Sequence, residues 1–419
     1  MRMAIVDGYG IGRFLVQRLR EAGADCIHLQ SDPHPAGAFR KSFQPELFSL
    51  DLGFSRDVQA LAARLAGLAV ARVVAGAESG VYLADTLSGR LGLPGNTPEL
   101  ARASTDKALM MDLAAQAGVA VPAGRAFGSV ADAVAWFAAA GLGEVVAKPV
   151  SSAGTDHVYF CARPDELGRA GDQILGSVSV YGHPTTRMLV QERVRGTEYC
   201  VNTVSQDGSH KIAEMWRYVK AEGPAGGPVY DYDEPVTADE PPWQVVREFT
   251  GEVLDALGIR SGAAHTEVMM TGSGPVLIES SARLGGSARP GVVEAYCGVS
   301  QAGLLAATLL DPARLAAFDD FAVRCRSALR LVEFRNRTAG RAVRGWAAAI
   351  ESLPSVVAII VAPSPGDWLE PTRDLMTSPG SVYLASADAA QVGRDYRLLR
   401  RWEEAGLYTG ASPGQLRRP

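Results

Sequence analysis

Residues 264–281 read AHTEVMMTGSGPVLIESS and decide the fold of the central part of the chain. Two apolar runs flank a turn rich in glycine, a pattern that predicts a β-hairpin. Pairing centred on Ser273 places Glu267 directly across from Glu279, and alternation along the strand puts Ser281 on the same face. Two facing carboxylates repel each other, and a divalent cation between them removes that repulsion. Oxygen ligands of this kind suit Mg²⁺.

A register shifted by one residue would instead put one of the two glutamates in solvent, and the hairpin alone does not decide between these alternatives. Two lysines favour the cation site. Lys107 begins a predicted helix, and Lys148 ends an apolar strand (144–148) beside the small-residue loop Ser151–Thr155. A lysine next to such a loop, with the loop amides, can bind phosphate. The alternative for Lys148 is a solvated strand end.

A further strand is predicted at Met188–Glu192, with Thr197–Ser205 as its partner. The free backbone groups of a strand edge can hydrogen-bond adenine. An acid a few residues further on, Glu198, can bind the ribose hydroxyls. This pattern alone is weak evidence for a nucleotide site, and it counts only together with the two lysines and the paired glutamates.

Taken in order, these elements resemble the ATP-grasp superfamily over roughly residues 78–290. The resemblance implies ATP as a substrate and Mg²⁺ as the cofactor, with Mn²⁺ as an alternative. It also assigns a binding role to each residue at a motif position. The positions that bind the nucleotide are occupied by Lys107, Lys148, Ser152, Gly154, Gln191, Glu192, Val194 and Glu198.

The resemblance further implies that Glu267 and Glu279 are metal ligands. Ser281 stands where many members of the superfamily carry the asparagine that completes the metal shell. A serine hydroxyl is shorter, so a water molecule would fill the gap. Arg283 matches the arginine that steadies the transferring phosphate or oxyanion, which makes Arg283 and Lys148 the expected catalytic residues.

Within the superfamily, three segments are similar to L-amino-acid ligases of the bacilysin and dapdiamide type: Ala264–Glu267, Ala282–Gly286 and Glu214–Tyr218. The resemblance implies an ATP-dependent carboxylate–amine ligase that forms a dipeptide or amide through an acyl phosphate, in natural-product biosynthesis. The alternatives are another ATP-grasp enzyme, of the biotin-carboxylase or purine-biosynthesis type, and an ATP-binding protein without catalysis. The motifs of biotin carboxylases and D-alanine ligases are absent.

The amino-acid pocket has weaker candidates, each with a surface or packing role as the alternative. Arg217 is favoured among them, because a guanidinium can hold a carboxylate by two hydrogen bonds. Glu78 follows a predicted strand end, where open α/β sheets bind ligands. The other candidates are His265, Tyr230, Asp231 and Arg289.

The fold class expected is α/β and α+β. Alternating strands and helices predict a Rossmann-like domain over residues 1–100, of the kind that precedes an ATP-grasp core. The ATP-grasp domain follows at 101–310, with the segment 223–232 as a long loop, and a small α+β domain at 311–419. The motif Gly8-x-Gly10-x-Gly12 is a poor match to the dinucleotide fingerprint, so no NAD site is expected.

The composition excludes several function classes. The 41 Lys and Arg residues against 46 Asp and Glu residues give a net charge of −5, without the basic excess of a nucleic-acid-binding protein. No apolar run is long enough for a membrane helix, and the start leaves no room for a secretory signal. Five scattered cysteines predict small core residues without disulfides. A cytoplasmic enzyme acting on small molecules is expected, and related enzymes are often homodimers.

Overall fold

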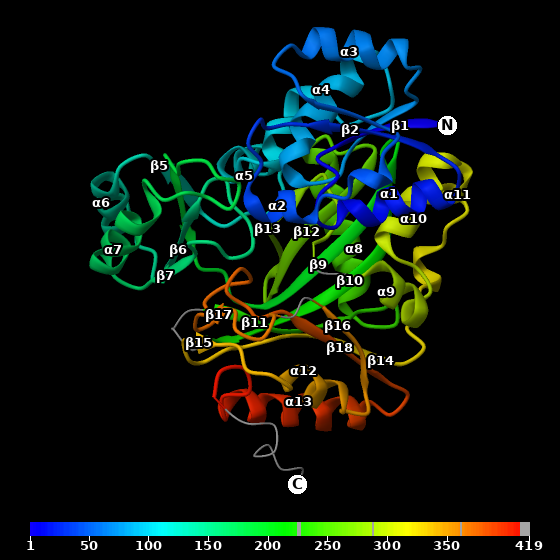
Figure 1. Ribbon diagram of the computed structural model, residues 1–419. Coiled ribbons are helices and arrows are strands. Elements are labelled where there is room, and N and C mark those ends of the chain that lie inside the picture. The colour runs from blue at the N-terminus through cyan, green and yellow to red at the C-terminus, as the bar shows by residue number, and fades with distance from the viewer. Residues whose placement is uncertain (224–227, 287–288, 361–362, 411–419) are drawn as a thin grey trace.

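The computed structural model describes residues 1–223, 228–286, 289–360 and 363–410, with only the backbone of Ala38, Phe39 and Pro228. An N-terminal α/β domain lies at the top in Figure 1 and a small α/β lobe at the left, and a large sheet runs from the centre into the C-terminal region. The mixed α/β and α+β class expected from the sequence is confirmed.

The N-terminal domain is a parallel four-stranded sheet in the order β3-β2-β1-β4, flanked by helices. Its glycine motif serves packing, because a Cβ at Gly12 would lie 2.3 Å from the carbonyl oxygen of Gly76. The turn before α1 therefore lies directly against the loop after β4. The elements are β1 (Arg2–Val6), α1 (Gly12–Glu21), β2 (Asp25–Gln30), α2 (Gly37–Ser42), β3 (Leu50–Phe54), α3 (Val58–Gly67), β4 (Arg72–Ala75) and α4 (Val81–Leu91).

The small lobe is an antiparallel sheet in the order β5-β8-β6-β7 with two helices packed on it. Strand β8 pairs with β5 and β6, so the predicted pairing of Met188–Glu192 with Thr197–Ser205 is wrong. The lobe comprises β5 (Gly124–Phe127), α6 (Val130–Ala140), β6 (Val145–Pro149), β7 (Tyr159–Cys161), α7 (Pro164–Ile174) and β8 (Met188–Glu192), and α5 (Lys107–Gln116) leads into it.

The large sheet has eight strands in the order β13-β12-β9-β10-β11-β14-β18-β16. The predicted loop 223–232 is wrong over residues 228–232, which belong to a strand, 228–235, while residues 224–227 lie outside the described residues. The central elements are β9 (Thr197–Gln206), β10 (Ser209–Glu222), β11 (Pro228–Pro235), α8 (Pro242–Ala256), β12 (Gly262–Thr271), β13 (Gly274–Ser281), α9 (Pro290–Cys297) and α10 (Gln301–Leu310).

The C-terminal region extends the large sheet with three strands and adds a separate two-stranded sheet of β15 and β17. Strand β14 pairs with β11 of the central region and with β18, and β18 pairs with β16. A buried ion-pair network fastens this junction: Asp231 accepts hydrogen bonds from Arg335 and Arg400, each at 2.7 Å. The region comprises α11 (Ala313–Ala316), β14 (Ala328–Glu333), β15 (Gly340–Arg341), α12 (Trp346–Glu351), β16 (Val356–Ile360), β17 (Trp368–Leu369), β18 (Ser381–Ser386) and α13 (Ala389–Glu404).

Hydrophobic side chains join the N-terminal domain to the large sheet. Leu15 and Leu19 of α1 share a buried cluster with Leu305 of α10 and with Val204 and Ala263 of the sheet. In Figure 1, α1 lies beside α10 accordingly. The N-terminal domain is therefore fixed against the large sheet, and Glu78, just after β4, lies 3.3 Å from Arg283, just after β13.

The cysteine prediction is wrong in one respect. Cys297 at the end of α9 and Cys325 before β14 form a disulfide, across a sequence separation of 28 residues. No spacing motif signals this pair, because the fold alone brings the two segments together. The other three cysteines are buried and free.

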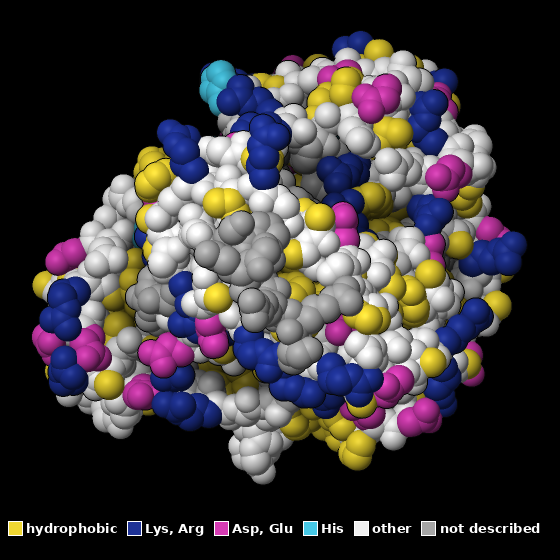
Figure 2. All heavy atoms as spheres, turned by 60° about the horizontal axis from the view of Figure 1, so that its bottom comes forward, with side chains coloured by type: hydrophobic (Ala, Val, Ile, Leu, Met, Phe, Trp, Pro, Cys, Tyr) yellow, Lys and Arg dark blue, Asp and Glu magenta, His cyan; other side chains and the backbone are white. Residues whose placement is uncertain are grey.

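Among the described residues, no single helix is long and apolar enough to span a membrane, and α9 and α10 pass that test only when taken together across a 95° bend. On the face shown in Figure 2, basic and acidic side chains are both spread widely over the surface.

Candidate active site

A cleft of about 620 Å³ opens between the small lobe and one face of the large sheet. Segments far apart in sequence line it, among them the loop after β6, the linker from β8 to β9, and strands β10, β12 and β13. Most of the predicted site residues border this cleft, namely Lys107, Lys148, Ser152, Gly154, Gln191, Glu192, Val194, Glu198, Arg217, Tyr230, His265, Glu267, Glu279 and Arg283.

The two glutamates of the hairpin face each other as the sequence predicted. Glu267 is paired with Glu279, and His265 with Ser281. The predicted centre of the turn is wrong, because Thr271 pairs with Gly274 across a two-residue turn. A bulge between Glu267 and the next pair restores the alignment; without it Glu267 would face Ile278.

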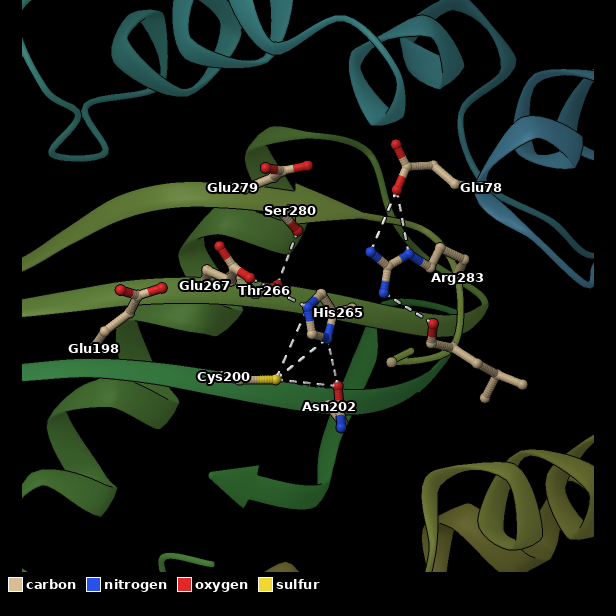
Figure 3. A network of polar contacts seen from close by, with 12 residues as sticks. Glu78, Glu198, Cys200, Asn202, His265, Thr266, Glu267, Glu279, Ser280 and Arg283 are labelled. Carbon is tan, nitrogen blue, oxygen red and sulfur yellow. Dashed lines mark hydrogen bonds and ion pairs between the residues drawn. The ribbon is translucent and has the colours of Figure 1, made fainter. Parts of the chain in front are cut away.

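Strand register places the polar residues of the cleft on one face of the sheet. Cys200 of β9 lies opposite Glu267, and Asn202 lies opposite His265. Figure 3 shows the side chains of Glu198, Glu267 and Glu279 on this face, with His265 beside Glu267. The face therefore carries the carboxylates and the groups that hold them.

Two buried lysines bring positive charge to the carboxylates. Lys107 Nζ lies 2.9 Å from Glu279 Oε1 and also donates a hydrogen bond to the carbonyl of Ser152. Burial alone would lower the pKa of Lys107, but the charges of Glu279 and Glu78 outweigh it and raise the pKa. Burial lowers the pKa of Lys148, which is 9% exposed. Anionic partners such as phosphate oxygens would therefore stabilise the charged form of Lys148.

Glu267 is held as an anion. Its Oε1 lies 3.7 Å from His265 Nε2. Burial raises its pKa, but the contact with His265 and the charges of Lys220 and Lys148 prevail and lower it. His265 in turn has Nδ1 2.8 Å from Asn202 Oδ1, which fixes the orientation of the ring.

The donor set fits a magnesium ion that is completed by substrate oxygens. In the part of the chain that the structure describes, no three His, Cys, Asp or Glu side chains gather as a metal-binding group. Two carboxylates are nevertheless sufficient, since Mg²⁺ in nucleotide sites is held by one or two carboxylates together with phosphates and water. The Oγ of Ser281 is buried on the same face and has no hydrogen-bond partner among the described residues, as expected of a group that meets a bound water.

The nucleotide end of the cleft carries unused hydrogen-bonding groups. The buried Nε2 of Gln191 has no partner within the described residues, and the same is true of the Val194 amide. Both lie in or beside the linker after β8, where the resemblance places adenine. Glu198 is engaged by Lys220 Nζ, 2.8 Å from each carboxylate oxygen. Lys220 was not found from the sequence, because the strand that carries it was not recognised.

The loop after β6 has the turned backbone expected of a phosphate loop. Gly154, Thr155 and His157 all have positive φ, of 70°, 63° and 50°. Successive turned peptides of this kind can aim several N–H groups at one anion. Ser152 stabilises the turn with a 2.5 Å hydrogen bond from Oγ to Asp156.

Arg283 reaches the N-terminal domain. Its Nε and Nη2 each lie 3.3 Å from Glu78 Oε2, as Figure 3 shows. Glu78 Oε1 accepts a 2.7 Å hydrogen bond from Tyr181 of the small lobe. The N-terminal domain, the small lobe and the segment after β13 thus meet at Glu78. The sequence analysis did not identify Tyr181.

The predicted role of Arg217 is not supported. Although Arg217 is among the residues that border the cleft, it lies opposite Tyr199 on β9, whereas Tyr218 lies opposite Glu198. Strand alternation therefore turns the Arg217 side chain towards the other face of the sheet. Its guanidinium is held by Glu240 at 3.4 Å and Glu234 at 3.5 Å. Because both terminal nitrogens of its guanidinium already contact glutamates, Arg217 does not offer the pair of N–H donors that would hold a substrate carboxylate.

The remaining candidates for the amino-acid pocket differ in their surroundings. Tyr230 borders the cleft, with Lys220 Nζ 4.8 Å from its ring centroid. Asp231 is occupied by the arginines of the C-terminal junction. Arg289 lies outside the cleft lining, just before α9, and packs on Phe14 of the N-terminal domain.

Comparisons with known proteins agree with this geometry. Residues 143–290 match the model of the ATP-grasp domain. Dapdiamide A synthase of Enterobacter agglomerans is 32% identical over 396 residues, which are 91% of this chain and 90% of that protein.

Solved structures show the same fold at lower identity. An L-amino acid ligase from Bacillus licheniformis superimposes with a TM-score of 0.72 at 17% identity, over 96% of this chain and 97% of the other. The biotin carboxylase domain of the 2-oxoglutarate carboxylase from Hydrogenobacter thermophilus, in complex with MgADP, gives 0.62 at 13% identity, over 92% and 86%. The chain therefore belongs to the ATP-grasp carboxylate–amine ligases, the family of dapdiamide A synthase, and is an enzyme that forms C–N bonds.

Proposed function

We propose that this ligase joins the carboxylate of an amino acid, or of a related small acid, to the amine of an L-amino acid, with release of ADP and phosphate in natural-product biosynthesis. One observation carries the proposal: the facing carboxylates Glu267 and Glu279 share a cleft with Lys107, Lys148 and Arg283. This arrangement concentrates positive groups where the terminal phosphates of ATP would lie.

The first step is attack of the substrate carboxylate on the γ-phosphorus of ATP, which yields an acyl phosphate and ADP. Lys107 and Lys148 offset the negative charge that builds on the phosphate oxygens. Glu267, Glu279 and a water on Ser281 would hold Mg²⁺, which supplies Lewis-acid stabilisation of the phosphates when bound. Mn²⁺ could take the same ligands.

In the second step the uncharged amine attacks the acyl carbon, a tetrahedral oxyanion forms, and phosphate leaves. Arg283 would stabilise that oxyanion and the departing phosphate. The loop Ser151–Thr155 would cover the phosphates and exclude water, which otherwise hydrolyses the acyl phosphate. Gln191, the Glu192 carbonyl and the Val194 amide would bind adenine, with Glu198 at the ribose.

The donor pocket is proposed beside Glu78. Its carboxylate can bind an ammonium group, and its contact with Arg283 brings that group next to the transferring phosphate. His265 and Tyr230 would border the same substrate. A homodimer and a cytoplasmic location complete the proposal and rest on the sequence alone.

The test is an assay of ADP, AMP and phosphate with L-amino acids supplied singly and in pairs. We expect ADP and phosphate in equal amounts, matched by an amide product, and only with a competent pair. Stoichiometric AMP would contradict the mechanism. ADP release stimulated by bicarbonate, and by no amine, would show a carboxylase of the biotin-carboxylase type instead.

A further inference from the structure

Two arginines from distant parts of the chain pack against the same aromatic ring. The guanidinium carbon of Arg13 lies 4.8 Å from the ring centroid of Phe14, and that of Arg289 lies 5.3 Å from it. Both side chains are partly exposed, Arg13 on the first turn of α1 and Arg289 directly before α9. The ring thus holds two positive groups in one place.

No carboxylate of the described residues neutralises either guanidinium. Across the described ranges, neither Arg13 nor Arg289 forms an ion pair with a carboxylate, whereas Arg18 on the same helix pairs with both Glu21 and Glu294. Burial, and then the charge of Arg13, lower the pKa of Arg289. Two adjacent like charges without a counter-ion are unfavourable, and an anion bound between them relieves the repulsion.

The helix ends add to the positive potential. Arg13 is the second residue of α1, and Arg289 is the residue before the first turn of α9. The dipole of each helix favours an anion near its N-terminus. The two arginines supply the forked donors that match a carboxylate or phosphate.

Both arginines are linked to the catalytic cleft. The residue before Arg13, Gly12, packs on Gly76, and Glu78 two residues further on holds Arg283. From the other side, Arg289 follows Arg283 by six residues. Neither arginine lines the cleft itself, but Gly12 next to Arg13 packs two residues from Glu78, the partner of Arg283 at the cleft.

We propose that Arg13 and Arg289 form an anion site for the carboxylate of the second, amine-bearing substrate. The proposal rests on the proposed function for the identity of its ligand, because that function requires a carboxylate to be held away from the reacting amine. Arg217, the arginine favoured by the sequence for this task, is already occupied by two glutamates. The glycine motif before α1 then has a role in this enzyme: it places Arg13.

The first test is binding of inorganic phosphate, a probe that needs no turnover. The full-length chain is saturated with Mg²⁺ and a non-hydrolysable ATP analogue, so that the nucleotide phosphate positions are filled, and phosphate is titrated by calorimetry. We expect phosphate binding in the wild type, and a loss of about 10- to 150-fold in Arg13→Gln and in Arg289→Gln, the range for a hydrogen bond to a charged group.

The matched control is Arg20→Gln, which removes the same charge from α1 at an exposed position whose guanidinium donates only to the Leu47 carbonyl among the described residues. It should bind phosphate as the wild type does. Arg289→Lys keeps the charge without the fork and should give an intermediate loss. Unchanged phosphate binding in both glutamine variants, or equal loss in Arg20→Gln, would overturn the proposal.

The second test assigns the ligand. In ADP-release kinetics, Arg13→Gln and Arg289→Gln should raise the KM of the amine-bearing amino acid 10- to 150-fold and leave the KM of ATP unchanged. The amide of that amino acid should be a poor substrate for the wild type and lose little more in the variants. An unchanged amino-acid KM would remove the carboxylate assignment. If no pair of substrates reacts but phosphate binding still depends on both arginines, the proposed function fails while the anion site stands.

Discussion

Tyr181 of the small lobe donates a 2.7 Å hydrogen bond to Glu78 of the N-terminal domain, and the other oxygen of Glu78 lies 3.3 Å from Arg283. Tyr181 belongs to the turn between α7 and β8, which the isolated β-bridge between Val178 and Pro184 closes. The small lobe, which lines the cleft, is thereby connected through one carboxylate to the arginine proposed to stabilise the oxyanion.

We expect Tyr181→Phe to lower kcat about 10-fold and to leave the KM of ATP nearly unchanged. The hydroxyl lost is a donor to a carboxylate, an interaction of roughly 1.5–3 kcal/mol, and it acts on Arg283 and not on the nucleotide site. Steady-state kinetics with saturating amino acids measure the effect. Tyr159→Phe is the control, because its hydroxyl bonds to Gln173 within the same lobe. Equal effects in the two variants would show that only the stability of the lobe has changed.

Glu279→Gln should keep the fold and lower kcat by at least ~10²-fold, the scale for loss of a main electrostatic stabiliser. The substitution removes a charge from the proposed metal site and from Lys107, 2.9 Å away. Ser281→Ala should have a much smaller effect, because its hydroxyl is proposed to act through water. Kinetics over a range of Mg²⁺ concentrations check both. Normal turnover of Glu279→Gln at saturating Mg²⁺, or equal inactivity of the two variants, would contradict this assignment.

The local parts of the site could be predicted from the sequence. The hairpin places Glu267 opposite Glu279 because its two strands are separated by only a short turn. The bulge that secures this alignment could not be predicted, since the pattern of apolar residues fits a regular ladder as well.

The rest of the fold and site could not be predicted, because it depends on pairing between strands that are far apart in the sequence. Strand β9 lies between β10 and β12, and the sequence contains no signal that separates this arrangement from pairing with β8. Because β10 was not recognised, the alternation that turns Arg217 away from Glu198 could not be used. Contacts between domains, such as Tyr181 with Glu78 and Arg289 with Phe14, depend on domain docking and have no signature in local sequence.

Gly285→Ala should destabilise the protein by about 1–3 kcal/mol, the usual effect of overfilling a packed region. An added Cβ would lie 2.5 Å from Asn202 Oδ1. Asn202 is buried and cannot move away cheaply, because it also contacts His265 and Glu214. Thermal unfolding measures the change, and Gly286→Ala is the control, since a Cβ there meets nothing within 4 Å. Equal melting temperatures for the two variants would show that Asn202 adapts freely.

The N-terminal domain carries a buried acid whose ionisation should make stability depend on pH. Asp85 on α4 is 6% exposed; its Oδ1 accepts a 3.0 Å hydrogen bond from Asn96, while Oδ2 has no partner among the described residues. Burial raises the pKa of Asp85 from 3.8 to about 7, although the bonds from Asn96 oppose the shift.

Because the folded-state pKa lies above the unfolded-state pKa, the stability that Asp85 contributes is complete below about pH 4 and is lost as the pH rises towards 7. Asp85→Asn cannot ionise, and should raise the free energy of unfolding at pH 8.5 by up to about 4 kcal/mol, from 1.36 kcal/mol per pKa unit. At pH 4.5 the gain should be small. Thermal unfolding of both proteins at the two pH values tests this, with the exposed Asp172→Asn as control. A melting temperature that rises equally at both pH values would assign the gain to packing and not to ionisation.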